Sequence, residues 1–177
     1  MGLSDDVRAS ILIGDYIGVD AGGKLNVIGL NFTHCGLQAN GASPAFYVAA
    51  IIDVPKKHLN DEFSISLELR DSTGNLFTVP GLPGQQDGLR ISQLVRAVAP
   101  ATNVITYFPH DMPGRAQFVV GFLNGLPLRA GESYAWTLAV DSQKRPAWQV
   151  SFHVVGPPPG PVVGGIDRPV EVPMPDL

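Results

Sequence analysis

The segment from Gly18 to Lys24 has the spacing of a phosphate-binding loop, because its letters GVDAGGK match the pattern G-x-x-x-x-G-K. In such a loop, backbone N–H groups at the start of a helix hold the phosphates, and a Ser or Thr after the lysine binds Mg²⁺. Here Leu25 stands in the place of that hydroxyl, and the apolar residues after it predict a strand. We therefore expect a turn between two strands at this position and predict no cofactor.

Metal or nucleophile chemistry would need histidine and cysteine side chains that converge from distant parts of the chain. The histidines are His34, His58, His110 and His153, and their spacing matches neither H-x-x-x-H nor H-E-x-x-H. The lone cysteine, Cys35, follows His34 directly, so the two side chains diverge if the segment is extended. One cysteine excludes an internal disulfide, and a buried thiol in the core is the simpler interpretation. With no G-x-S-x-G segment either, we expect neither an enzyme nor a metal site.

Aspartates near the ends of predicted strands could bind Ca²⁺, as they do in some β-sandwiches. They are Asp20, Asp53, Asp61, Asp71 and Asp141. Aspartate also favours turns through its own hydrogen bonds to the backbone, and the chain contains no D-x-D-x-D or comparable ligand loop. The sequence therefore favours turns over calcium sites.

Two tryptophans, Trp136 and Trp148, could form a platform for a sugar if both faced solvent. Both stand in segments where apolar residues alternate strictly, and this pattern is more typical of a core. Tyr107 and Phe108, directly before Pro109, are better candidates for an exposed contact.

Length and composition indicate one globular domain that is not mostly helical. The chain has 177 residues, of which 45% are hydrophobic and 16% are charged. Its 20 glycines and 16 prolines exceed the average combined share of about 12%, which argues against a mostly helical protein. With 12 Lys and Arg against 16 Asp and Glu, the net charge is −4. That balance provides no basic surface for nucleic acid or anionic lipid, so we predict neither as a partner.

The first residues, Met1 to Asp6, include no basic segment of the kind that begins a signal peptide. The apolar run Ile11–Val19 is interrupted by glycine and aspartate and is too short for a membrane span. We expect synthesis in a cytoplasm, which includes that of an infected host cell.

Short segments rich in β-branched and aromatic residues alternate with glycine-bearing turns and predict strands. The segments are 10–19, 25–32, 46–54, 63–69, 76–79, 89–98, 117–123, 134–140 and 148–154. The first two form a hairpin across residues 20–24, and residues 89–98 fit helical spacing as well as strand parity, with the strand favoured. The pattern predicts an antiparallel β-sandwich of about seven to nine strands, with less than about a tenth of helix.

The clearest alternation predicts which side chains face the core. In the segment FSISLEL, residues Phe63 to Leu69, the apolar residues point inward and Ser64, Ser66 and Glu68 point to solvent. Two further sets each share one face: Tyr134, Trp136, Leu138 and Val140, and then Trp148, Val150, Phe152 and Val154.

A sharp change in composition begins at Gly156, and from there to Leu177 the chain holds seven prolines and four glycines in 22 residues. Proline lacks the N–H donor and fixes φ, so neither a helix nor a central strand forms there. We divide the chain into a lead (1–6), a sandwich domain (7–155) and an extended C-terminal arm (156–177). Fully extended, the arm would reach about 60–70 Å at roughly 3.1 Å per residue.

The prolines and intermittent apolar side chains of this arm are the predicted partner-binding residues. They are Pro157, Pro158, Pro159, Val162, Val163, Ile166, Pro169, Val170, Val172, Met174 and Leu177.

Several motifs together resemble a family of small uncharacterised proteins from actinobacteria and their bacteriophages. They are IGDYIGVDAGGKLNVIG at 13–29, VP at 54–55 with HLN at 58–60, SLELRD at 66–71 with GN at 74–75, LRAGESYAW at 128–136, and the final strand around Trp148. The resemblance covers roughly residues 10–155, with a departure at about 80–115. It implies a β-sandwich and a phage setting, and it brings no known activity or catalytic residues.

From these observations we expect a non-enzymatic structural protein of a bacteriophage particle, such as a capsid decoration or head-associated protein. Its arm would anchor it to neighbouring virion subunits, which include copies of itself. It would reside in the virion after synthesis in the host cytoplasm, and the bacterial cytoplasm is the alternative location. The alternative functions are a carbohydrate or host-surface binding module and a tail or baseplate component.

Overall fold

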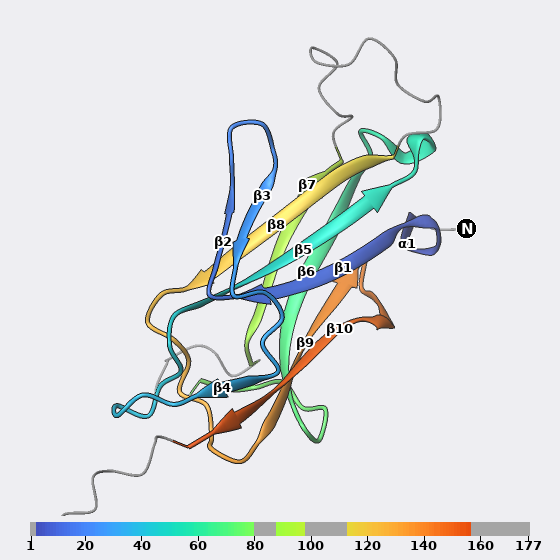
Figure 1. The fold of residues 1–177 in the computed structure, drawn as a ribbon. Coiled ribbons are helices and arrows are strands. Elements are labelled where there is room, and N and C mark those ends of the chain that lie inside the picture. The colour runs from blue at the N-terminus through green and yellow to red at the C-terminus, as the bar shows by residue number, and fades with distance from the viewer. Residues whose placement is uncertain (1–2, 80–87, 98–112, 157–177) are drawn as a thin grey trace, which may run out of the picture.

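The computed structural model describes residues 3–79, 88–97 and 113–156, and these form a β-sandwich (Figure 1). Of the described residues, 57% lie in strands and 5% in helices. The predicted all-β class is confirmed, and the helix content is below the expected tenth. No helix in these three ranges is long and apolar enough to cross a membrane. The predicted C-terminal arm, residues 157–177, lies outside the described residues.

One layer is a three-stranded antiparallel sheet with the order β1-β5-β8. Its strands are β1 (Arg8–Gly14), β5 (Phe46–Val54) and β8 (Gly114–Phe122). The other layer is a five-stranded sheet with the order β4-β10-β9-β6-β7. Its strands are β4 (His34–Gly36), β10 (Gln143–Val155), β9 (Ser133–Val140), β6 (Glu62–Asp71) and β7 (Arg90–Arg96).

The remaining elements are short. A two-stranded hairpin consists of β2 (Tyr16–Val19) and β3 (Leu25–Ile28), and two helical turns are α1 (Leu3–Asp6) and η1 (Lys56–His58). The described residues thus contain ten strands, slightly more than the seven to nine that the sequence predicts.

The core fills the space between the two sheets, as the alternation along the strands predicts. The apolar residues of β6 and β9, including Phe63, Leu67, Trp136 and Leu138, are buried. From the opposite sheet, the ring of Phe122 lies 5.2 Å from that of Trp136, measured between centroids. The two inner faces therefore interdigitate, as expected of packed sheets.

The predicted strand 10–19 is wrong in one respect, because the structure divides it at Asp15. Gly14 ends β1, which pairs with β5, and Tyr16 starts β2, which pairs with β3. At Gly29 φ is +64°, and a Cβ atom there would meet the Asp15 carboxylate. The close approach of the segment around Asp15 to the end of β3 therefore requires glycine at position 29. The close crossing turns the hairpin out of the sheet and onto its outer face.

The short strand β4 was not predicted, and it pairs in parallel with the end of β10. The sandwich is therefore antiparallel except at this edge. The connection between the predicted strands 134–140 and 148–154 is shorter than expected, because Asp141 and Ser142 alone form the turn, with positive φ values of 46° and 65°. Positive φ at both central residues is typical of a type I′ hairpin.

Two further predicted strands have different outcomes, one confirmed and one wrong. Residues 89–98 were predicted as a strand, and β7 confirms this between Arg90 and Arg96. Residues 76–79 do not form a strand, but a bridge joins Leu76 to Arg70, and Phe77 donates to the Leu69 carbonyl at 2.8 Å.

The N-terminal residues that the structure describes pack against the sandwich. Ser4 is buried, and its carbonyl accepts a hydrogen bond from Nη2 of Arg145 at 2.7 Å. The guanidinium of Arg145 also lies 4.8 Å from the ring centroid of Trp148. Residues 3–6 are thus in contact with β10, although the sequence suggested a separate lead.

Candidate functional site

The eleven predicted partner-binding residues, from Pro157 to Leu177, lie outside the described residues, as do Tyr107, Phe108 and His110. The candidate surfaces below therefore come from the sandwich itself. Two of them stand out, one on the outer face of each sheet.

The phosphate-loop spacing at 18–24 forms the turn of the β2–β3 hairpin, as predicted. The carboxylate of Asp20 accepts hydrogen bonds from the backbone N–H groups of Gly22 and Lys24, at 2.8 and 2.9 Å. An aspartate thus occupies two of the amides that a phosphate would need, and the chain continues as β3 instead of a helix. This geometry does not suit a nucleotide.

The histidine and cysteine side chains take separate positions in the described structure. Cys35 is buried while the adjacent His34 is exposed, which confirms that they diverge. Burial raises the pKa of the Cys35 thiol, and the nearby charge of Asp15 adds to the effect. Within the three described ranges, no group of three or more His, Cys, Asp and Glu side chains could hold a metal ion.

His58 has partners that the sequence did not indicate. Its Nδ1 lies 3.0 Å from Asp61, and its Nε2 lies 3.1 Å from Asp6, which is 52 residues away in the sequence. Hydrogen bonds to Asp61 and then to Asp6 raise the pKa of His58. Lys57 also pairs with Asp6 at 2.5 Å, so this cluster ties α1 to η1.

The five strand-end aspartates act separately. Asp20 and Asp71 each accept hydrogen bonds from backbone N–H groups of their own turns. Asp53 pairs with Arg115 at 2.8 Å, and Asp61 contacts His58. Asp141 accepts a hydrogen bond from the backbone N–H of Ser64 at 2.9 Å. Each is therefore occupied by a turn or a partner, in agreement with the turn interpretation.

Both tryptophans belong to the core, as the alternation predicts. Trp136 and Trp148 are buried, so the sugar platform considered for them is excluded. A sugar would need another surface.

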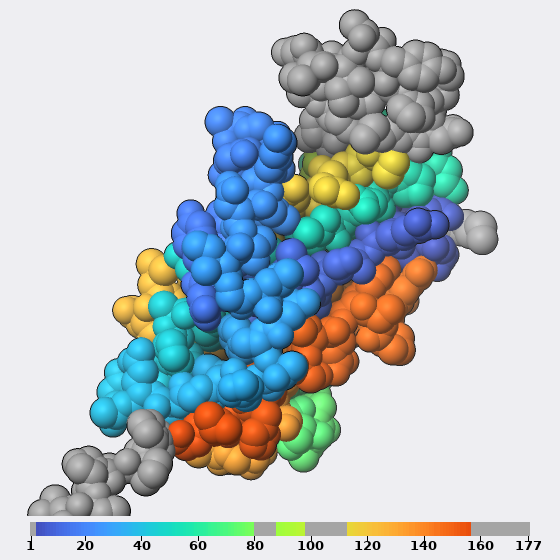
Figure 2. Space-filling model, viewed as in Figure 1, coloured from blue at the N-terminus to red at the C-terminus, as the bar shows by residue number. Residues whose placement is uncertain are grey.

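The β2–β3 hairpin, blue in Figure 2, lies over part of the outer face of the three-stranded sheet, where β2 contacts β5 and β8. Ile17 of β2 and Ala49 of β5 are buried but lie outside the main core, and β2 contacts β5, so the hairpin adds a small buried apolar layer on this face. Gln117 of β8 donates a hydrogen bond to the Gly23 carbonyl at 3.1 Å and fixes the hairpin tip.

The hairpin and the segment after it also carry apolar side chains that face solvent. Their exposed fractions are 46% for Tyr16, 49% for Val19, 65% for Ile28 and 51% for Leu30. We call these four residues the hairpin patch. In the register of the hairpin, Tyr16 lies opposite Ile28, so these two side chains share one face, while Val19 lies on the same face as Ile17. Exposed apolar side chains that gather on one face commonly mark contacts with other molecules.

The outer face of the five-stranded sheet contradicts one prediction. Glu68 was expected to point into solvent, but its exposed fraction is 2%. The outward direction is correct, since Glu68 lies opposite Thr137 of β9 and Arg90 of β7 in the register. Long cationic side chains from its own strand and from the neighbouring segments β7 and β10 cover Glu68, and strand alternation does not reveal this cover.

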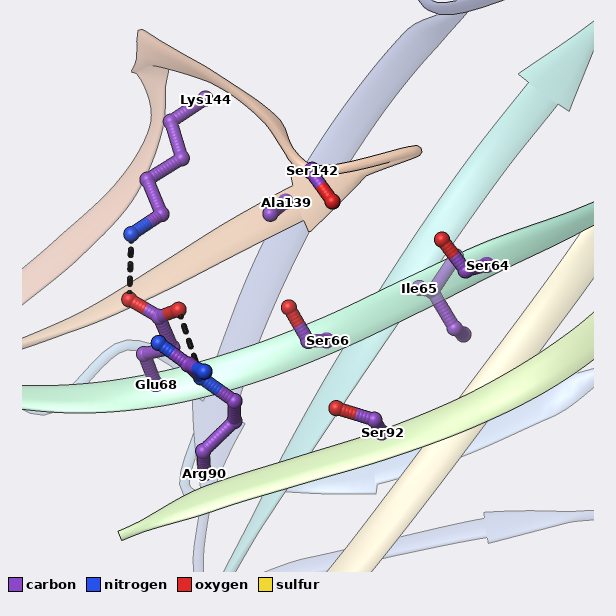
Figure 3. A pocket seen from close by; sticks show the side chains of 9 residues that line it. All are labelled: Ser64, Ile65, Ser66, Glu68, Arg90, Ser92, Ala139, Ser142 and Lys144. Atoms are coloured by element: carbon purple, nitrogen blue, oxygen red, sulfur yellow. Dashed lines mark hydrogen bonds and ion pairs between the residues drawn. The ribbon is translucent and has the colours of Figure 1, made fainter. Parts of the chain in front are cut away.

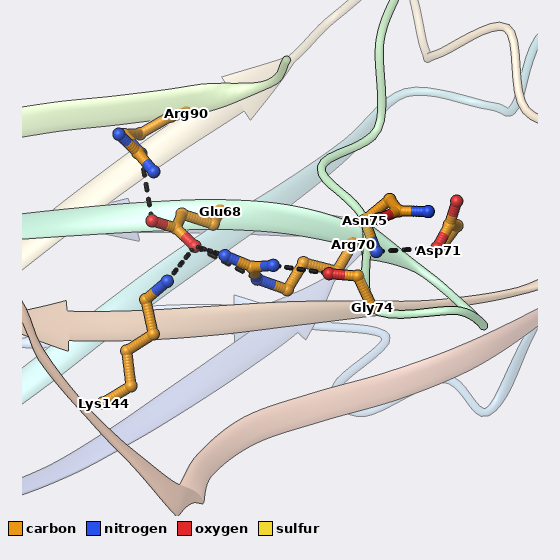
Figure 4. Close-up of polar contacts among 7 residues, drawn as sticks. All are labelled: Glu68, Arg70, Asp71, Gly74, Asn75, Arg90 and Lys144. Atoms are coloured by element: carbon orange, nitrogen blue, oxygen red, sulfur yellow. Dashed lines mark hydrogen bonds and ion pairs between the residues drawn. The ribbon is translucent and has the colours of Figure 1, made fainter. Parts of the chain in front are cut away.

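Three cations surround the Glu68 carboxylate (Figure 4). Lys144 Nζ lies 2.6 Å from Oε2, Arg70 reaches Oε2 with Nη2 at 2.5 Å and with Nε at 3.1 Å, and Arg90 Nε lies 2.9 Å from Oε1. Burial by itself raises the pKa of Glu68, but the hydrogen bonds from Lys144 and Arg70 outweigh it and hold the pKa below its usual value. The carboxylate is therefore ionised at neutral pH.

A polar groove of about 250 Å³ begins beside this network (Figure 3). It is lined by Ser64, Ile65, Ser66, Glu68, Arg90, Ser92, Ala139, Ser142 and Lys144. In Figure 3, Arg90 and Lys144 meet at Glu68, while the hydroxyls of the serines on β6 and β7 lie farther along the same face. The sequence indicated the outward serines of β6 but not the groove, because its walls come from four separate segments.

Comparisons of this chain with the models of known protein families and with the curated proteins gave no match.

Proposed function

We propose that this chain is a non-enzymatic structural protein of a bacteriophage particle, a capsid decoration or head-associated protein. It contacts neighbouring virion subunits, including copies of itself, through the hairpin patch and the C-terminal arm. The phage setting comes from the sequence resemblance described above. The observation that carries the proposal is the hairpin patch, whose apolar side chains face solvent on a hairpin fixed to a sheet.

The hairpin patch suits a contact between subunits because it is apolar and held in place. Ile17 anchors one side of the hairpin and the bond from Gln117 anchors its tip, so little freedom would be lost on docking. Burial of the four side chains would then contribute at about 25 cal/mol per Å² of apolar surface.

The arm supports the same function from the sequence. Its seven prolines favour extended backbone and remove donors, so its carbonyls and apolar side chains stay free for a partner surface. The net charge of −4 favours protein partners over nucleic acid or anionic membrane.

The proposal is tested with purified particles that carry the full-length chain or variants of it. Mass spectrometry of intact wild-type particles should find the chain at a fixed copy number. Deletion of residues 157–177 should leave the melting temperature of the isolated chain within a few degrees of wild type and abolish incorporation. Replacing Ile166, Val170 and Val172 together with Ser should have the same effect, because these apolar side chains supply most of the expected burial.

The hairpin patch is tested by the double variant Ile28→Ser with Leu30→Ser, and Leu94→Ser serves as the control. Leu94 is 63% exposed on the outer face of the other sheet, so its loss removes a similar apolar surface elsewhere. We expect the double variant to fold and to fail in incorporation, while the control incorporates normally. Full incorporation of both the double variant and the truncated chain would overturn the proposal.

A further inference from the structure

We propose that the groove beside Glu68 binds an acidic sugar unit, that is, a single ring that carries hydroxyls and one carboxylate. This site is independent of the hairpin patch and of the proposed assembly role, because it lies on the outer face of the opposite sheet.

The size of the groove limits the ligand. Its volume of about 250 Å³ is below the range of roughly 300–1,000 Å³ that is typical of sites for drug-sized molecules. One six-membered ring with its substituents is therefore a better match than a nucleotide or a peptide.

The charge of the groove favours an anion. One carboxylate, Glu68, is shared by Arg70, Arg90 and Lys144, so positive charge exceeds negative charge by two at this end of the groove. Arg90 pairs with Glu68 through Nε, and its terminal nitrogens have no hydrogen bond to the described residues. A guanidinium binds a carboxylate well through parallel N–H donors. Both Arg90 and Lys144 are partly exposed and thus accessible to a ligand.

The remainder of the groove favours hydroxyl groups. Ser66, Ser92 and Ser142 line it, and the structure gives their hydroxyls no partner within the described residues. A serine hydroxyl donates one hydrogen bond and accepts two, as a sugar hydroxyl does. The fourth serine, Ser64, donates to the Asp141 carboxylate at 3.3 Å. That negative charge lies at the end away from Arg90 and Lys144, so it favours a ligand whose acid group points toward Glu68.

Glu68 positions the cations and does not itself meet the anion. Glu68 is 2% exposed, and its carboxylate holds Arg90 of β7 and Lys144 of β10 above β6 from opposite sides. The cations are thereby arranged before a ligand arrives, which reduces the side-chain entropy lost on binding.

The test is a titration of the full-length chain with D-glucuronate, D-glucose and inorganic phosphate, followed by ¹H–¹⁵N NMR. Glucuronate should saturably shift the amides of residues 64–68, 90–94 and 139–144, and glucose and phosphate should each bind at least about tenfold more weakly, since each lacks one of the two features recognised. Equal affinity for glucose and glucuronate, equal affinity for phosphate, or no saturable shift with glucuronate would each overturn the proposal.

Variants of the lining residues test whether glucuronate binds in the groove. Arg90→Gln and Lys144→Gln should each weaken glucuronate binding by about tenfold or more, because each removes a charge-assisted hydrogen bond. Ser92→Val, on the edge strand β7, tests the hydroxyl end without altering the ion pairs and should also weaken binding. The control is Arg96→Gln, since Arg96 is on the same strand and pairs with Glu62 outside the groove. Unchanged affinity in the first three variants, or an equal loss in the control, would contradict the assignment.

Discussion

The two outer faces of this sandwich are covered in different ways. On the three-stranded sheet, the β2–β3 hairpin places Ile17 over the strands and adds a second apolar layer. On the five-stranded sheet, Arg70, Arg90 and Lys144 cover Glu68 and leave a groove lined by serines. The first face presents apolar surface that suits a protein neighbour, and the second presents charge and hydroxyls that suit a small polar ligand.

A variant in the core between the two sheets should lower stability more than a variant on either outer face. Trp136→Ala should lower the free energy of unfolding by about 3–5 kcal/mol, because it removes a fully buried ring and leaves a cavity. Chemical denaturation measures this change. A loss below about 1 kcal/mol would mean that the sheets do not pack around this residue.

The apolar cover of the three-stranded sheet should be the next most sensitive region. Ile17→Ala should destabilise the chain by about 2–4 kcal/mol, since the side chain is buried beneath the hairpin. Ile28→Ala, on the paired strand but exposed, is the matched control and should change stability by less than about 0.5 kcal/mol. Similar losses in both variants would show that the hairpin is seated differently.

The ion-pair network on the five-stranded sheet should lose stability when the Glu68 carboxylate is removed. Glu68→Ala should destabilise by about 2–3 kcal/mol, because three cations then face each other without a counter-charge. Glu62→Ala removes an exposed carboxylate from the same strand, and its ion pair with Arg96 should contribute less than about 1 kcal/mol. If Glu68→Ala is as mild as Glu62→Ala, the network is an ordinary solvated surface.

The pH dependence of stability should separate the two faces further. The pKa of Glu68 is lower in the folded chain than its unfolded value of about 4.3. The ionised carboxylate therefore stabilises the fold above about pH 4.3, and this stabilisation is lost as the pH falls through the folded pKa. The difference in melting temperature between wild type and Glu68→Gln should therefore shrink as the pH is lowered from 6 to 3. The difference between wild type and Ile17→Ala should show no matching decrease, and a constant gap for Glu68→Gln would contradict the role of the network.

The smallest effect is expected at the hairpin turn. Lys24→Ala should change stability by less than about 0.5 kcal/mol and leave assembly intact, because the residue is exposed at the tip. Calorimetry and particle occupancy measure the two quantities. Saturable ATP or GTP binding that the substitution abolishes would contradict the turn assignment.

Sequence patterns predicted the features that depend on neighbouring residues. Alternation identified β6, β9 and the buried tryptophans, and the missing hydroxyl after Lys24 distinguished a turn from a phosphate loop. These features follow from periodicity and local hydrogen bonding.

The features that the sequence did not predict depend on contacts between distant segments. Glu68 alternates like a surface residue, and besides Arg70 on the same strand its cover comes from Arg90 and Lys144, which are 22 and 76 positions away in the sequence. In the same way, the break at Asp15 depends on where β3 crosses β1, and one of the two partners of His58, Asp6, is distant in the sequence. No local pattern contains this information.

The most direct test of the proposed assembly role is hydrogen–deuterium exchange of the chain, free and incorporated in particles. We predict added protection in peptides that cover residues 16–30, where the hairpin patch lies, and unchanged exchange in peptides that cover residues 88–97 of the opposite sheet. Unchanged exchange across residues 16–30, or added protection confined to residues 88–97, would contradict the assignment of the hairpin as the contact surface.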